Sequence, residues 1–295
     1  MYQQIDANRH RTWILLSLFV GLLAGAGYLL GLANGDRGSG LVFALVVSGV
    51  SVTFSWFLGD KLILLTSHAK AITAREQNEY VWNLVENLCI ASGLPLPHIY
   101  LIDDPSPNAF ATGRDPAHAS IALTTGLVQQ LENEELEGVI AHELSHVKNL
   151  DTRYMILVAV LVGTLSLLGD WFVHGGFRRR SDREGNGGIF LIIGLVFVVL
   201  APLIGQLIKF AISREREYLA DASAALLTRY PEGLARALEK ISASAIPVQN
   251  APQASAHLWI ADPTGRTRGL GSKLAGLFST HPPITARIQR LRSML

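Results

Sequence analysis

The chain opens with two long apolar stretches. Residues 13–33 run for 21 positions without a charge, and residues 41–59 run for 19. A stretch of about 18 or more such residues marks a membrane-spanning helix, because a helix satisfies its own backbone hydrogen bonds inside hydrocarbon. We therefore predict an N-terminal membrane anchor over residues 1–65, with transmembrane helices at 13–33 and 41–59. A cleaved signal peptide is the alternative for the first stretch, although its apolar run is long for one.

Two further apolar stretches predict a hydrophobic hairpin over residues 151–212, with arms at 154–173 and 189–212. The first arm has only 16 uncharged residues before Asp170, which is short for a complete span. The loop 174–188 carries four Arg against two acids, a balance that the positive-inside rule places on the cytoplasmic side. We favour a spanning hairpin, and a hairpin that is buried in protein or only partly inserted stays an alternative.

The two remaining regions, 66–150 and 213–295, have the pattern of a soluble domain in two parts. Basic residues flank the anchor on both outer sides, which predicts that both parts are cytoplasmic. Hydrophobic periodicity and turn residues predict the following elements: a helix through 81–89 that stops at Gly93, strands at 98–103 and 119–123, a helix capped by Asn133, helices at 213–227 and 231–244, a long loop at 246–273 and a terminal helix after His281.

Composition agrees with a membrane protein. Hydrophobic residues make up 49% of the chain and charged residues 17%, against about 25% charged in an average soluble protein. The mean hydropathy is +0.30. A net charge of +1 without a basic run predicts no nucleic-acid partner. The single cysteine, Cys89, cannot form an internal disulfide, and its amphipathic helix predicts that it is buried as a small apolar side chain.

The segment His142-Glu-Leu-Ser-His146 carries the candidate chemistry. Residues four apart lie on one face of a helix, so both imidazoles can reach one ion. Zinc suits nitrogen ligands, and a catalytic zinc keeps a position for water, whose pKa it lowers to roughly 7. Glu143 would lie beside that water as the general base. A surface histidine pair on an ordinary amphipathic helix is the alternative, but both histidines avoid the apolar stripe of the helix.

A second acidic pattern offers the missing ligand. Glu217 and Asp221 lie four apart on one helical face, directly after the predicted hairpin. A site with two histidines needs a third protein ligand, for which Glu is a known choice, and Asp221 would then hold a ligand imidazole through its second nitrogen. Two solvated acids are the alternative. Because a hairpin returns its ends to the same side, we predict one zinc per chain, held by His142, His146 and Glu217.

The chain resembles the HtpX-type heat-shock membrane metalloproteases, bacterial relatives of the type I CAAX prenyl endopeptidases. The likeness covers nearly the whole chain and rests on the two N-terminal spans, the segment 107–113, the zinc helix with His142 and His146, the hairpin, the run from Ser213 to Asp221 and the His281-Pro-Pro motif. It implies a mainly α membrane protein with a small β-sheet, in which a hydrophobic hairpin interrupts a gluzincin-like metalloprotease domain. It also implies that Glu217 is the third zinc ligand and that Asp221 supports a ligand.

Two further roles rest on the resemblance. Asn108, Ala109 and Phe110 match the family segment beside the substrate cleft, where a peptide could add as a strand to a sheet edge. A plain turn is the alternative there. His281 and Arg287 resemble a family pair that steadies the oxyanion of the reaction, a role that needs donors aimed at developing charge.

The sequence thus predicts a zinc endopeptidase of the bacterial cytoplasmic (inner) membrane that degrades misfolded or damaged membrane proteins. We expect a multi-pass protein whose partners are the lipid bilayer and protein substrates and whose active site faces the cytoplasm. A CAAX-type prenyl peptidase is one alternative, although four spans look too few to enclose its chamber. A non-catalytic membrane scaffold with a structural zinc is another. The loop 246–273 is a candidate lid, and the oligomeric state is left open.

Overall fold

The computed structural model describes residues 2–33, 35–170, 214–244, 246–249, 251, 253–263 and 282–294. The contacts within the chain divide it into two compact units. The first combines Met1–Asn8, Asp60–Ile156 and Ala211–Leu295, and the second combines Arg9–Gly59 and Leu157–Phe210. The loop and second arm of the predicted hairpin, residues 174–212, lie outside the described residues, as does His281.

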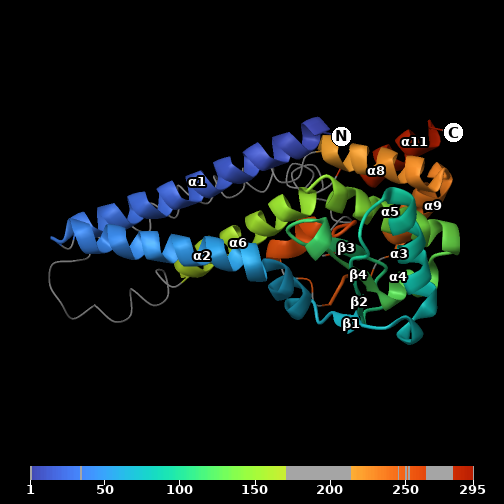
Figure 1. Ribbon diagram of the computed structural model, residues 1–295, viewed down its shortest axis with the longest axis horizontal. Coiled ribbons are helices and arrows are strands. Elements are labelled where there is room, and N and C mark those ends of the chain that lie inside the picture. The colour runs from blue at the N-terminus through green and yellow to red at the C-terminus, as the bar shows by residue number, and fades with distance from the viewer. Residues whose placement is uncertain are drawn as a thin grey trace. The chain divides into compact units, whose positions relative to one another are not determined.

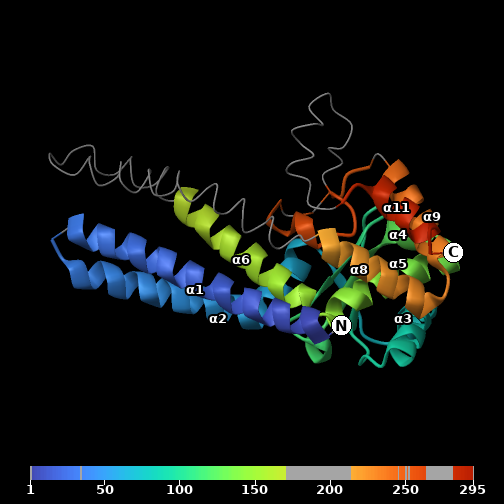
Figure 2. The same ribbon diagram turned by 90° about the horizontal axis from the view of Figure 1, so that it is seen from above.

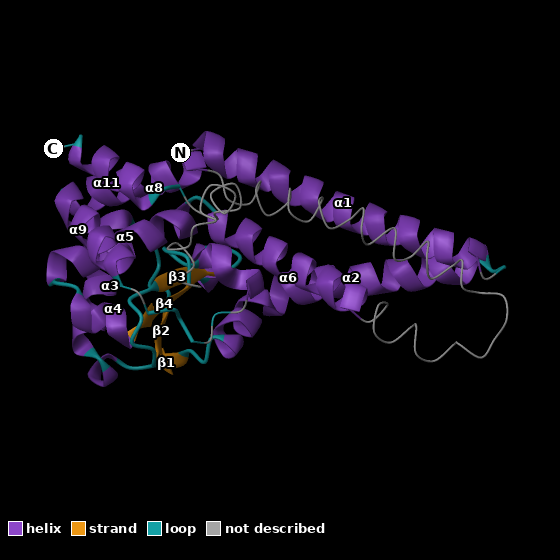
Figure 3. Ribbon diagram, turned by 180° about the vertical axis from the view of Figure 1, so that it is seen from behind, coloured by secondary structure: helices purple, strands orange, loops and turns teal. Residues whose placement is uncertain are grey.

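Helices make up most of the described chain, together with one small sheet (Figures 1 and 3). The α-helices are α1 (Tyr2–Ala33), α2 (Arg37–Thr66), α3 (Glu79–Ser92), α4 (Thr125–Gln130), α5 (Asn133–Lys148), α6 (Asp151–Asp170), α8 (Arg214–Thr228), α9 (Pro231–Ala243) and α11 (Ile284–Arg292). The strands are β1 (Lys70–Ile72), β2 (His98–Ile102), β3 (Ala109–Thr112) and β4 (Ser120–Thr124), and the short 3-10 helices include η4 (Gln253–Leu258).

The two N-terminal apolar stretches form the helices α1 and α2, as predicted. Within them, Ile5–Leu29 and Gly38–Thr66 are the described segments long and apolar enough to cross a membrane. Large apolar side chains stand exposed along both helices, among them Trp13 at 68% and Phe43 at 69%. Such an exposed apolar surface is unfavourable in water and suits contact with lipid.

The sheet has the strand order β1-β2-β4-β3. Strand β2 pairs parallel with β4, while β1 and β3 pair antiparallel with their neighbours. The predicted strands at 98–103 and 119–123 are confirmed as β2 and β4. Periodicity did not indicate β3, because all four of its residues are buried and the strand has no polar face.

Helix α5 lies at the centre of the first unit and packs against α3, α8, α9 and β3 (Figure 2). The expected apolar stripe is buried, including Leu136, Val139 and Ile140. Burial goes beyond that stripe, because almost every face of the helix is covered from Leu136 to Val147. The expected cap at Asn133 is wrong. The N-terminal cap is Glu132, one residue earlier, and its N–H donates to the Glu135 carboxylate at 2.8 Å.

The crossing of α5 and α9 depends on a glycine. A Cβ atom on Gly138 would lie 2.8 Å from the backbone nitrogen of Leu234, closer than side chains come to backbone atoms. We expect Gly138→Ala to lower the free energy of unfolding, because overpacking costs about 1–3 kcal/mol and the gain in helix propensity returns only about 1 kcal/mol. Thermal unfolding in detergent would measure this. Gly163→Ala is the control, since no described atom lies within 4 Å of its added carbon.

Cys89 offers a second test of the packing. It is 3% exposed, as predicted, and burial, followed by the charge of Glu86, raises the pKa of its thiol to about 11. Because the thiolate is the reactive form, we expect the folded protein to react slowly with a thiol reagent at pH 8 and the unfolded protein to react rapidly. A folded chain that reacts as fast as the denaturant-unfolded chain would contradict this packing.

Candidate active site

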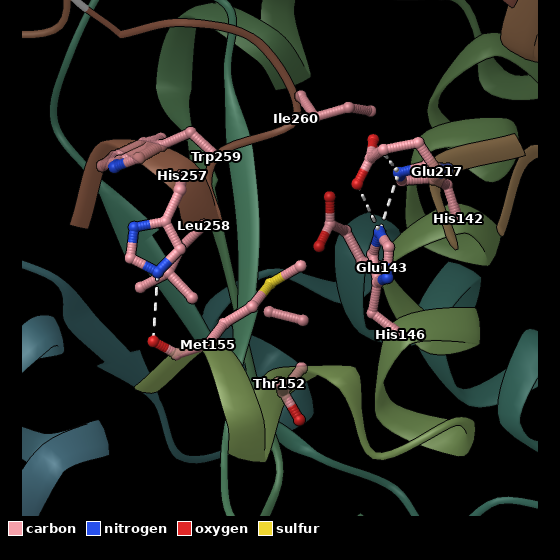
Figure 4. Close-up of a pocket in the computed structure, with 11 residues that line it drawn as sticks. His142, Glu143, His146, Thr152, Met155, Glu217, His257, Leu258, Trp259 and Ile260 are labelled. Atoms are coloured by element: carbon pink, nitrogen blue, oxygen red, sulfur yellow. Dashed lines mark hydrogen bonds and ion pairs between the residues drawn. The ribbon is translucent and has the colours of Figure 1, made fainter. Parts of the chain in front are cut away.

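Three side chains from two helices converge on one point. His142 and His146 extend from one face of α5, and Glu217 extends from the first turn of α8 (Figure 4). The two Nε2 atoms lie 3.2 Å apart. Glu217 Oε1 lies 3.5 Å from His146 Nε2, and Glu217 Oε2 lies 3.8 Å from His142 Nε2. The structure therefore brings together the three predicted ligands, although Glu217 lies more than 70 residues after the two histidines in the sequence.

These distances fit a tetrahedral metal ion. Bonds of about 2.0–2.1 Å to nitrogen and oxygen place two ligands of a tetrahedron roughly 3.3–3.4 Å apart, close to the observed separations. The formal charges agree with this. Four carboxylates (Glu143, Asp151, Glu217 and Asp221) and two guanidinium groups (Arg216 and Arg287) are buried around the imidazoles. With both imidazoles counted as neutral, the form that binds a metal, the formal charge of the site is −2. A divalent cation would balance that charge.

His142 is held by Asp221, on the side of the ring that faces away from His146 and Glu217, and Asp221 is held in turn by Arg287. Its Nδ1 lies 3.0 Å from Asp221 Oδ1, and Arg287 donates to both carboxylate oxygens at 2.7 and 2.9 Å. Burial and the Arg287 charge lower the pKa of His142 to about 4, which keeps the imidazole neutral. The Asp221 acceptor at Nδ1 favours the tautomer whose Nε2 carries no proton. Burial opposes ionisation of Asp221, but the charge of Arg287 and its hydrogen bonds outweigh it and lower the pKa of that carboxyl to about 2. Asp221 thus lies where it was predicted.

His146 has a second carboxylate partner, which the sequence analysis missed. Its Nδ1 lies 3.0 Å from Oδ2 of Asp151, the first residue of α6. Burial alone would lower the pKa of His146, but the hydrogen bond with Asp151 and the charge of Glu217 raise it to about 9, which shows how strongly this pocket favours positive charge. The available signal was an acid directly after the zinc helix, because a ligand imidazole needs an acceptor for its other nitrogen.

Glu143 lies beside the cluster with its carboxylate turned into the pocket (Figure 4). It is 2% exposed and accepts a hydrogen bond from the backbone N–H of Ala111 on β3. Burial raises the pKa of this carboxyl to about 7. A carboxyl with a pKa near neutrality can both accept and release a proton, which is what a general base and acid requires.

The pocket is enclosed on the other side by part of the segment 246–273, which was predicted as a long loop and as a candidate lid. Residues 257–260 face Glu143 across it (Figure 4), and Trp259 is completely buried. His257 is 3% exposed, and its Nε2 lies 3.0 Å from the carbonyl of Met155. The lining comprises Ala111, His142, Glu143, His146, Thr152, Met155, Glu217, His257, Leu258, Trp259 and Ile260. Because residues 246–273 have no periodicity, the sequence did not indicate which of them form this wall.

The predicted cleft segment forms the start of β3 at the edge of the sheet. Asn108, Ala109 and Phe110 are all buried, and their outer edge is paired with the chain itself. The N–H of Ile260 donates to the carbonyl of Ala109 at 2.9 Å, and Trp259 forms a β-bridge with Phe110. A peptide therefore cannot pair with this part of the edge while residues 259–260 are in place.

Arg287 does not line the pocket among the described residues. Besides Asp221, its guanidinium contacts Glu217 Oε2 at 3.4 Å and donates to the Ile260 carbonyl at 3.3 Å. At this position Arg287 can orient Asp221 and Glu217, and its predicted role at the oxyanion stays a prediction. His281, the other member of that pair, lies outside the described residues.

Comparisons with known proteins agree with this geometry. Residues 75–295 match the model of peptidase family M48. The chain is 45% identical to a protease HtpX homolog of Tropheryma whipplei (strain Twist) over 294 residues, covering 100% of this chain and 98% of the relative. It is 44% identical to a protease HtpX homolog of Dictyoglomus thermophilum, covering 99% of this chain and 94% of that relative.

A solved structure resembles the fold. The crystal structure of S. mikatae Ste24p aligns with a TM-score of 0.52 at 20% identity, covering 99% of this chain and 67% of that one. This likeness concerns the fold, while the family follows from the sequence matches. With two histidines and a glutamate converging on one point beside Glu143, the chain is a metalloprotease that belongs to peptidase family M48.

Proposed function

We propose that this chain is a zinc-dependent endopeptidase of the bacterial cytoplasmic membrane that degrades misfolded or damaged membrane proteins. The observation that carries the proposal is the buried cluster of His142, His146 and Glu217, whose ligand atoms lie within 4.8 Å of one another beside the carboxylate of Glu143. The protease names of the relatives favour catalysis over a scaffold with a structural zinc. The apolar surfaces of α1 and α2 support a membrane location.

Each residue of the site has a defined task in peptide hydrolysis. His142, His146 and Glu217 would hold one zinc, and two imidazoles with one carboxylate form a known catalytic zinc set. When bound, zinc acts as a Lewis acid that polarises a carbonyl and lowers the pKa of water. Glu143 accepts the proton of the attacking water and transfers it to the leaving amine nitrogen. The burial of Glu143 keeps its proton affinity high enough for both steps.

The substrate strand has a defined place to bind. Because Trp259 and Ile260 pair with the edge of β3 at Phe110 and Ala109, a peptide would add to β3 beside Ala111, which lines the pocket. Movement of residues 253–263 would extend that edge. Unfolded segments supply the extended backbone that such pairing needs, which fits the degradation of misfolded proteins.

The proposed topology is multi-pass with the site on the cytoplasmic side. Arg9 and Arg11 precede the first apolar stretch, and Lys61, Lys70 and Arg75 follow the second. By the positive-inside rule both flanks of the anchor remain in the cytoplasm. The ligands of the site follow the anchor in sequence and would share that side.

The first test concerns the general base. We expect Glu143→Gln to keep its zinc and to lose cleavage of an unfolded model protein by about 10²- to 10⁴-fold, the usual contribution of a positioned acid–base group. Cleavage and zinc content would be measured on the detergent-purified full chain. Glu134→Gln, an exposed position in the same helix, is the matched control. Full activity in Glu143→Gln would refute the assigned role.

The second test concerns the third ligand. We expect Glu217→Ala to lose bound zinc, because two imidazoles alone hold the ion weakly, while Glu215→Ala keeps it, because Glu215 is exposed on another face of α8. Elemental analysis after dialysis against a weak chelator would measure the stoichiometry. Retention of one zinc in Glu217→Ala would show that a different group completes the site.

A further inference from the structure

The support of His146 reaches to the N-terminal end of the chain. Asp151 uses Oδ2 for His146 and leaves Oδ1 for other partners. Asn8 donates from its side-chain amide to that Oδ1 at 2.7 Å and to the carbonyl of Asn149 at 3.0 Å. Asn8 is 1% exposed and belongs to the same compact unit as the metal ligands.

A guanidinium group completes this arrangement. Arg216 donates from Nη1 to the side-chain oxygen of Asn8 at 3.3 Å, and its Nε lies 3.6 Å from Asp151 Oδ1. Both ends of the Asn8 amide are therefore used, the nitrogen as a double donor and the oxygen as an acceptor. An aspartate would place a second negative charge beside Asp151, and an apolar residue would make none of these hydrogen bonds.

The local backbone makes this contact possible. Helix α5 ends at Lys148, and Leu150 has a positive φ of 59°. A non-glycine residue in the left-handed region is unfavourable and persists where the surroundings require it. This sharp turn begins α6 at Asp151, five positions after His146, with the carboxylate directed back at the imidazole.

The two halves of the metal site are built alike. His142 is held by Asp221, which is paired with Arg287. His146 is held by Asp151, whose other oxygen, Oδ1, lies 2.7 Å from the amide nitrogen of Asn8 and 3.6 Å from Nε of Arg216. The residues that hold His142 come from the C-terminal part of the chain. For His146, the residue that holds its carboxylate partner comes from the N-terminal helix α1.

We propose that Asn8 is a positioning residue of the metal site, which fixes the orientation of His146 through Asp151. This inference rests on the proposed function, since it concerns the ion that His146 would bind. It makes the residues that lead into the first apolar span a part of the metal site. Binding of the ion and ordering of residues 2–8 are then thermodynamically coupled, so each stabilises the other.

The test measures metal binding in the full chain. Asn8→Ala and the nearly isosteric Asn8→Leu are expected to weaken zinc binding about 10-fold in competition with a chelator. This is the lower end of the usual effect of losing an outer partner of a metal ligand, because Asn8 acts on His146 through Asp151. Both should alter the visible spectrum of the cobalt-substituted protein, which reports ligand geometry. Asp6→Ala, an exposed acid in the same helix, should leave affinity and spectrum unchanged.

A double-mutant cycle shows whether Asn8 acts through Asp151. Asp151→Asn should weaken zinc binding by itself, and adding Asn8→Ala to it should cost little more. Wild-type and variant apo proteins are compared by thermal unfolding, so that a general loss of folding is recognised. Should a variant fail to fold, hydrogen exchange in the wild type still decides, because amides of residues 2–8 should exchange more slowly when zinc is added.

The outcomes separate this inference from the function on which it rests. If wild type binds zinc and the Asn8 variants have the same zinc affinity and the same cobalt spectrum as wild type, Asn8 has no positioning role. Additive effects of the Asn8 and Asp151 substitutions on zinc affinity would lead to the same conclusion. Unchanged exchange of residues 2–8 on zinc addition would overturn the coupling in the same way. A wild-type chain that binds no zinc would instead overturn the proposed function, and this inference with it.

Discussion

The rest of the structure depends on the negative charge buried around two imidazoles. A buried charge without a partner is strongly unfavourable, and the four carboxylates near His142 and His146 are only half neutralised by two arginines. A divalent cation at the proposed site would resolve this imbalance. Burial of α5 on nearly every face follows from the same need, since ligands, base and supporting acids must all be kept from water. Metal binding should therefore contribute directly to folding free energy.

The same charged groups explain how the two imidazole rings are held in a fixed orientation. Each imidazole turns its Nε2 to the point where the proposed zinc would bind and its Nδ1 to a carboxylate, Asp221 in one case and Asp151 in the other. Each carboxylate is held in turn by a further side chain, Asp221 by the Arg287 guanidinium and Asp151 by the Asn8 amide. A chain of this kind restricts ring rotation more tightly than packing alone, because hydrogen bonds have a preferred direction.

The segment that completes the wall of the pocket also covers part of the sheet edge beside it. Trp259 is fully buried against Phe110, with ring centroids 4.7 Å apart, and the neighbouring backbone pairs with the edge of β3. An open sheet edge invites pairing with other chains, and here the protein covers part of its own edge. A substrate peptide that adds as a strand must use the remaining edge beside Ala111 or displace this segment.

The sequence by itself determined the elements and the chemistry that depend on local spacing. The apolar lengths of α1 and α2, the two inner strands, the pair His142 and His146 on one helical face, and Glu217 four residues before Asp221 all follow from periods that are visible along the chain. Only the tertiary structure decided that α5 is buried all round, that residues 257–260 wall the pocket, and that Asn8 and Asp151 support His146. The physical reason is that such contacts join residues far apart in sequence, so no local period carries them, and they arise only when folding brings groups with complementary charge and hydrogen-bonding capacity together in a buried place.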